Sequence, residues 1–119
     1  MSEYIPLRKP GSDIPMTASA AITGGQLVYV TGNETVGPTT AATAAWFGVA
    51  ANDAAIGEKV TIHRGGAHEL AASGPIAAGA RVIPAAAGAV VTIGSVTDYS
   101  QVVGIATSAA ASGKVRVAF

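Results

Sequence analysis

Short stretches rich in β-branched residues alternate with glycine-containing turns over most of the chain. Turn residues recur about every eight to twelve positions, which is typical of an all-β sandwich or barrel. The last stretch alternates cleanly, with Val115 and Val117 on one face and Lys114 and Arg116 on the other, which indicates a half-buried strand. The clearest predicted strands are 27–31, 46–50, 59–63, 89–93 and 114–119.

Two alanine-rich pieces, 41–45 and 106–112, complicate this pattern. Alanine is the best helix former, but pieces of this length are too short to be stable helices alone. We allow one helical turn at each, with 39–45 otherwise forming a loop that leads into the strand at 46–50.

The pattern of the first half returns in the second half, about 55 residues later. Ile22, Gly25 and Val28 have the same spacing as the triplet at 76, 79 and 82, and the segment 47–50 is matched by 103–106. Two copies are too few for a solenoid, so we expect each copy to bury its apolar face against the other. The prediction is a compact β-sandwich or barrel built from two similar β modules, a single domain over 17–119 with halves of about 17–72 and 73–119.

Residues 1–16 differ from the rest and predict an extended N-terminal arm. Residues 4–11 carry two prolines and the only adjacent pair of basic residues, and each proline favours extended geometry in its predecessor. The arm also carries apolar side chains that a solvated tail does not need, so docking on its own chain or another is one interpretation and a partly disordered terminus is the other. The candidate contact residues are Tyr4, Ile5, Pro6, Leu7, Arg8, Lys9 and Pro10.

Charge and composition narrow the possible partners. Seven Lys and Arg balance seven Asp and Glu, so no summed field attracts nucleic acid or an anionic membrane. Charged residues make up only 12% of the chain, a low share for an isolated soluble monomer, which indicates that a partner covers part of the surface. The absence of cysteine excludes disulfides and thiol chemistry. No signal peptide or membrane-length apolar run is seen, so we expect synthesis in the cytoplasm.

The histidines are the first candidates for chemistry. His63 and His68 flank Gly65–Gly66, which looks like a hairpin tip that could bring the two rings together. Glu69 is the only further ligand suggested nearby, whereas zinc prefers three or four. We interpret them as surface or interface histidines and expect no metal and no cofactor.

The other candidates also have plain structural interpretations. Asp13, Asp53 and Asp98 lie at presumed turns, where aspartate is favoured because its side chain bonds its own backbone. No serine lies in a Gly-x-Ser-x-Gly elbow, so we expect no catalytic residue and no enzyme. Trp46 and Phe47 are predicted to be core or subunit-interface anchors, with a ligand-stacking platform as the alternative.

Taken together, the order and spacing of four segments resemble the head decoration, or capsid cement, proteins of tailed bacteriophages and prophages. These segments are 17–28, 47–58, 74–82 and 103–106, followed by the closing strand Gly113–Val117. The resemblance covers roughly residues 4–119. It implies a structural protein without catalysis that binds the major capsid protein on the outer surface of a phage head, as homotrimers at local threefold positions, and stabilises the shell. It also implies that the arm contacts the shell or a neighbouring subunit.

Two alternatives remain open from the residues alone. A carbohydrate-binding module of a virion surface requires exposed aromatic rings, which would have to be Trp46 and Tyr99. A small hydrolase or lyase subunit requires His63, His68 and Glu69 to converge in a pocket shared with a second chain.

Overall fold

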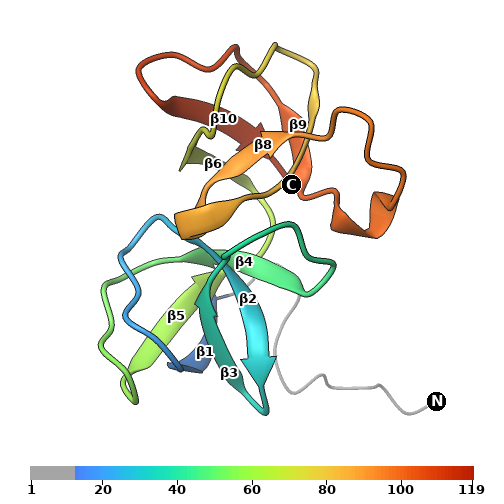
Figure 1. Cartoon of the computed structure of the whole chain (residues 1–119). Coiled ribbons are helices and arrows are strands. Elements are labelled where there is room, and N and C mark those ends of the chain that lie inside the picture. Colours follow the sequence, from blue (N-terminus) through green and yellow to red (C-terminus); the bar gives the residue numbers. More distant parts are fainter. Residues whose placement is uncertain (1–12) are drawn as a thin grey trace, which may run out of the picture.

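The chain folds into two β modules of five strands each (Figure 1). The computed structural model describes residues 13–119. Module one is a closed barrel with the strand order β1-β3-β2-β4-β5, and module two is a five-stranded sheet with the order β6-β10-β9-β7-β8. The strands of module one are β1 (Asp13–Ala18), β2 (Leu27–Gly32), β3 (Thr35–Pro38), β4 (Trp46–Ala50) and β5 (Lys59–His63); those of module two are β6 (Ala67–Ala71), β7 (Arg81–Pro84), β8 (Val90–Thr92), β9 (Gly104–Ala106) and β10 (Lys114–Ala118).

The two modules have the same topology. If β1 to β5 are matched in order with β6 to β10, each pair of neighbouring strands in the sheet of module two corresponds to a pair of neighbouring strands in module one. The parallel pairing of β1 with β3 closes the barrel, and its counterpart in module two is a single parallel bridge between Ala72 and Val90. The backbone hydrogen bonds there also match, since Ser19 N donates to Val36 O at 2.9 Å and Ser73 N donates to Val90 O at 2.8 Å. The prediction of an all-β fold made of two similar modules is confirmed.

The repeated isoleucine-glycine step has one structural role in both copies. Ile22 is buried and pairs with Ala54, and the equivalent Ile76 is also buried and accepts a hydrogen bond from Ala110 N. The following glycine, Gly25 or Gly79, has a φ of 93° or 85°, a conformation that glycine adopts without a steric cost. The step therefore caps one end of each module and turns the chain into the next strand.

A second pair of glycines permits close contact between strands. A Cβ on Gly48 would lie 2.4 Å from the carbonyl oxygen of His63, and a Cβ on Gly104 would lie 2.1 Å from that of Ala118. His63 ends β5, and Ala118 ends β10. Each module thus contains one position where two neighbouring strands come so close together that only glycine fits.

Each module encloses its own apolar core. Module one packs Met16, Ala18, Ile22, Val28, Val36, Ala50, Ala54, Val60 and Ile62, and module two packs Leu70, Ile76, Val82, Val90, Val103, Ala106, Val115 and Val117. Leu27 and Val49 belong to module one by sequence but pack into the core of module two. The expectation that the two copies bury their apolar faces against each other is therefore right for one face of β2 and β4 and wrong for the rest, because the other core side chains pack within their own module.

Trp46 and three polar contacts complete the junction between the modules. The Trp46 ring meets Phe119 edge-on at 5.9 Å between centroids, and its Nε1 donates to the Ser100 carbonyl at 3.3 Å. Three hydrogen bonds join module one to the turn between β7 and β8. Thr39 Oγ1 donates to Ala85 O at 2.7 Å, and Gln26 Nε2 donates to Ala87 O at 3.1 Å. In return, Gly88 N donates to Thr39 O at 3.0 Å. The junction thus joins the outer side of β2 and β4 to this turn and to the C-terminal residue.

Some local expectations differ from the structure. Neither alanine-rich piece forms a helical turn; the two 3₁₀ turns, η1 (Ala86–Gly88) and η2 (Tyr99–Gln101), lie elsewhere. Segment 65–66 is not a hairpin tip, because β5 pairs with β1 and β4 whereas β6 pairs with β10. Residues 13–16, expected in the arm, begin β1, and β6 joins module two although its residues precede position 73.

We predict that Gly104→Ala and Gly48→Ala each lower the free energy of unfolding by about 1–3 kcal/mol, because the new methyl group meets a backbone carbonyl that cannot rotate away. Gly24→Ala is the matched control, since its Cβ would find no atom nearer than 3.4 Å, and we expect a change within about 0.5 kcal/mol. Urea unfolding of the three variants measures this. Equal stability of all three would contradict the role assigned to these two positions.

For the junction, we predict that Trp46→Ala lowers the free energy of unfolding by about 3 kcal/mol, the lower end of the range for large aromatic truncations, because Trp46 is half-buried. Trp46→Phe keeps a ring against Phe119 and loses only the bond to Ser100, so it should cost about 1 kcal/mol. Chemical unfolding followed by circular dichroism distinguishes the two. A Trp46→Ala variant as stable as the parent would show that the junction does not depend on this ring.

Candidate functional site

The connection between the modules brings the two histidines together. Residues 64–66 link β5 to β6, and the rings of His63 and His68 stack at 5.8 Å with an interplanar angle of 18°. His63 Nδ1 lies 2.6 Å from a carboxylate oxygen of Asp13, and the His68 ring meets Phe119 edge-on at 5.3 Å. Asp13, His63 and His68 line a surface hollow of about 410 Å³, together with residues 64–67. The sequence suggested that the rings could meet, but not that Asp13, at the start of β1, would join them.

Glu69 does not line this hollow. His68 and Glu69 are consecutive on β6, so their side chains point to opposite faces of the strand. No group of three or more His, Cys, Asp or Glu side chains that could hold a metal ion occurs within residues 13–119. Every buried side-chain nitrogen or oxygen in the same residues has a hydrogen-bond partner. The geometry accordingly offers a stacked histidine pair with one carboxylate.

The remaining aspartates have structural roles. Asp53 accepts a hydrogen bond from Gly24 N at 2.8 Å, which ties together two loops of module one. Asp98 accepts from Ser100 N at 3.2 Å and caps the turn η2. The turn interpretation holds for Asp98, whereas Asp53 bonds the backbone of a distant loop and Asp13 lies in β1 and contacts His63.

Phe47 packs against the core of module one and is covered on its outer side by an arginine. The Arg64 guanidinium lies 4.4 Å from the centroid of the Phe47 ring, and Arg64 Nη1 donates to the Phe47 carbonyl at 2.6 Å. Phe47 therefore contributes to module one, while its neighbour Trp46 contributes to the junction with module two. The arm residues Tyr4–Pro10 lie outside the residues that the structure describes.

The two rings named for the carbohydrate-binding alternative are those of Trp46 and Tyr99. Trp46 is partly covered, with Phe119 against one side of its ring system. Tyr99 is 70% exposed on the turn η2. The two rings required by the carbohydrate-binding alternative thus differ in environment, and one of them is engaged in holding the modules together.

The sequence analysis overlooked a pair of residues on the outer side of module two, Arg81 and Ile105. They are exposed, and they are the counterparts of the buried Leu27 and Val49 in module one. A comparison of the two copies position by position could have found them, because a buried apolar pair in one copy is replaced by an arginine and an exposed isoleucine in the other.

No helix within residues 13–119 has the length and apolar character needed to cross a membrane.

Comparison with known proteins agrees with this arrangement. The protein fold is similar to that of a chain from the crystal structure of the head fiber gp8.5 N base in bacteriophage phi29, with a TM-score of 0.64 and 22% sequence identity over 91% of this chain and 92% of that chain. A search of curated proteins finds no significant match. A family model described as phage cement protein matches residues 8–119, nearly the whole sequence, and the chain therefore belongs to the phage cement protein family.

Proposed function

We propose that this chain binds the outer surface of a phage head as a structural decoration protein and stabilises the shell, with the major capsid protein as its partner. The match of residues 8–119 to the phage cement protein family carries this proposal. The similarity of the fold to the phi29 head fiber base supports a place on the virion. We further propose that the chain acts as a homotrimer at local threefold positions and has no enzymatic activity.

The surface of the molecule suits this role. Its solvent-accessible area is 6563 Å², so a standard interface of about 800 Å² per partner would cover more than a tenth of it. A trimer that contacts three equivalent shell sites gains avidity through effective concentration, so each single contact can be weak. A neutral chain with few charges needs no electrostatic steering to find such a repeated surface.

The alternatives receive less support from the geometry. The enzyme alternative needs His63, His68 and Glu69 in one pocket, whereas His63 and His68 line one surface hollow and Glu69 lines a different one with His68. The carbohydrate-binding alternative needs Trp46 as an open platform, and Trp46 is engaged with Phe119 and Ser100. The family match supports neither alternative.

We predict saturable co-sedimentation of the purified protein with undecorated phage heads, with a copy number at saturation that equals the number of local threefold positions on the shell. A β protein of similar size from an unrelated source serves as the control for trapping in the pellet. Failure to bind any head, undecorated or mature, would refute the decoration role.

We also predict that deleting residues 1–12 leaves the described β fold intact but raises the Kd for heads at least tenfold, which corresponds to about 1.4 kcal/mol of binding energy. The deletion keeps Asp13 and the whole of β1, so the unfolding midpoint should not change. Replacing residues 1–12 by a Gly/Ser segment of equal length is the matched control, because it keeps chain length and removes the arm side chains. Equal occupancy of the deletion variant and the parent would exclude the arm as a capsid contact.

A further inference from the structure

The two apolar cores differ in which module supplies their side chains. The core of module one is made of side chains from module one alone. The core of module two also contains Leu27 and Val49, from β2 and β4, and the half-buried ring of Trp46 packs against it. Leu27 and Val49 are 0% and 3% exposed, so both are fully used in this packing. Module two therefore needs module one to complete its core, whereas module one has a complete core of its own.

The two modules also differ in how firmly the sheet closes. In module one, the parallel pairing of β1 with β3 joins two consecutive positions of each strand. The equivalent seam of module two lies between β6 and β8, and the single bridge between Ala72 and Val90 closes it. A shorter pairing offers fewer backbone hydrogen bonds to hold two strands together. Module two is thus the less firmly closed of the two copies, although the topology is the same.

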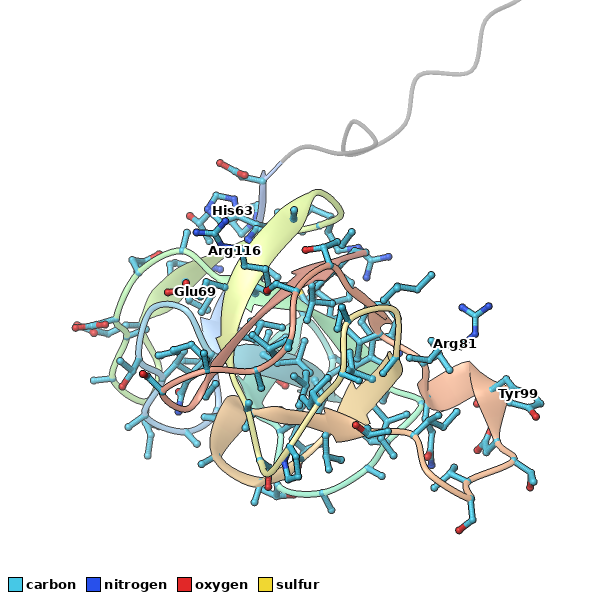
Figure 2. All side chains as sticks on the ribbon, turned by 90° about the horizontal axis from the view of Figure 1, so that it is seen from above. His63, Glu69, Arg81, Tyr99 and Arg116 are labelled. Atoms are coloured by element: carbon cyan, nitrogen blue, oxygen red, sulfur yellow. The ribbon has the colours of Figure 1, made fainter. Side chains whose placement is uncertain are left out.

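Charged side chains do not strengthen module two. Arg81 and Tyr99 project from one side of the molecule, away from Glu69 (Figure 2). Within residues 13–119, no ion pair joins two charged side chains of module two. Its closure therefore depends on the apolar core that it shares with Leu27 and Val49, and on the hydrogen bonds from module one to the turn between β7 and β8.

Unfolding of one module has different consequences for the other. If module two unfolds alone, module one keeps its barrel and its own core, and only the outward side chains Leu27 and Val49 become exposed. If module one unfolds alone, the core of module two loses both of these side chains. The loss of large buried side chains from a core is strongly destabilising. The state with module two open and module one folded is therefore favoured over the opposite state.

We propose that module two opens by local unfolding as one cooperative unit while module one stays folded, and that module two does not stay folded when module one opens. Proteins open in such units, with free energies between zero and the global value. Leu27 and Val49 do not separate from a folded module two, because they are part of its core; module two opens by losing its own fold. The inference does not rest on the proposed function, and its test needs no phage head.

The test is native-state hydrogen exchange of the full chain, followed by NMR at urea concentrations below the unfolding midpoint. The reporters are the amides of Val60 and Ile62 on β5 and those of Val115 and Val117 on β10, the equivalent strand of module two. We expect the β10 amides to be at least tenfold less protected than the β5 amides, because they exchange through the local opening. Equal protection of the two strands, or lower protection of β5, would overturn the proposal.

The same substitution at equivalent sites of the two copies supplies a matched pair. Ile22 and Ile76 are 3% and 4% exposed, and Ile→Val in a core lowers protection by roughly two- to tenfold. Ile76→Val should lower the protection of β5 and β10 by the same factor, because residue 76 is unfolded in both open states. Ile22→Val should lower only that of β5, because Ile22 stays in place when module two opens alone. An equal fall on both strands in Ile22→Val would show a single cooperative unit.

Leu27→Ala tests whether a residue of module one stabilises module two. We expect the protection of the β10 amides to fall at least tenfold, as for a core residue of module two, although Leu27 lies on β2. If module two no longer folds in this variant, the β5 amides should still be protected, because the core of module one is unchanged. Complete unfolding of the chain by Leu27→Ala, or unchanged protection of β10, would contradict the proposed dependence.

Discussion

In each module, the arrangement of the strands depends on one position where two neighbouring strands lie so close together that no side chain fits. At Gly48 and Gly104 the backbone of one strand lies against the terminal carbonyl of the next, and a Cβ would fall well inside contact distance. The strand pairs involved are short, with two register partners each, Val49–His63 with Ala50–Ile62 and Val117–Ala106 with Ala118–Ile105. Few hydrogen bonds hold these pairs, so the close approach is needed to keep the barrel wall continuous. His63 ends β5, so the same close approach sets where the linker leaves module one and where the histidines meet.

Much of the fold could be predicted from the sequence because the same pattern occurs in both halves of the chain. The glycine turns at Gly25 and Gly79 and the buried residues Ile22 and Ile76 occupy equivalent sites, and their spacing is visible without coordinates. Strand order was not predictable, because the parallel pairing of β1 with β3 and the return of β5 to β1 join segments far apart in the chain. Alanine propensity misled at 41–45 and 106–112, because short segments follow their tertiary contacts instead of local preference.

The candidate site was predictable in one respect only, namely that the rings of His63 and His68 could come together. The meeting of His63 with His68 depends on a linker that leads to a new module, whereas the sequence at Gly65–Gly66 resembles a hairpin tip. Contact with Asp13 depends on the pairing of β1 with β5, a non-local feature. Binding surfaces carry no motif, since their energy comes from shape and from a few central side chains. The comparison of two copies in one chain supplies a reference that a single copy lacks.

The two copies differ at the face that carries Leu27 and Val49 in module one. Leu27 and Val49 form a permanent apolar junction, as expected for surfaces that never separate. Arg81 stands where Leu27 stands in module one, and burying an unpaired guanidinium is costly, so this position favours exposure to solvent in module two. Among the described residues Arg81 has no hydrogen bond or ion pair through its side chain. The fold is thus kept in both copies while the role of this face differs, from an intramolecular junction at Leu27 and Val49 to an exposed surface at Arg81 and Ile105.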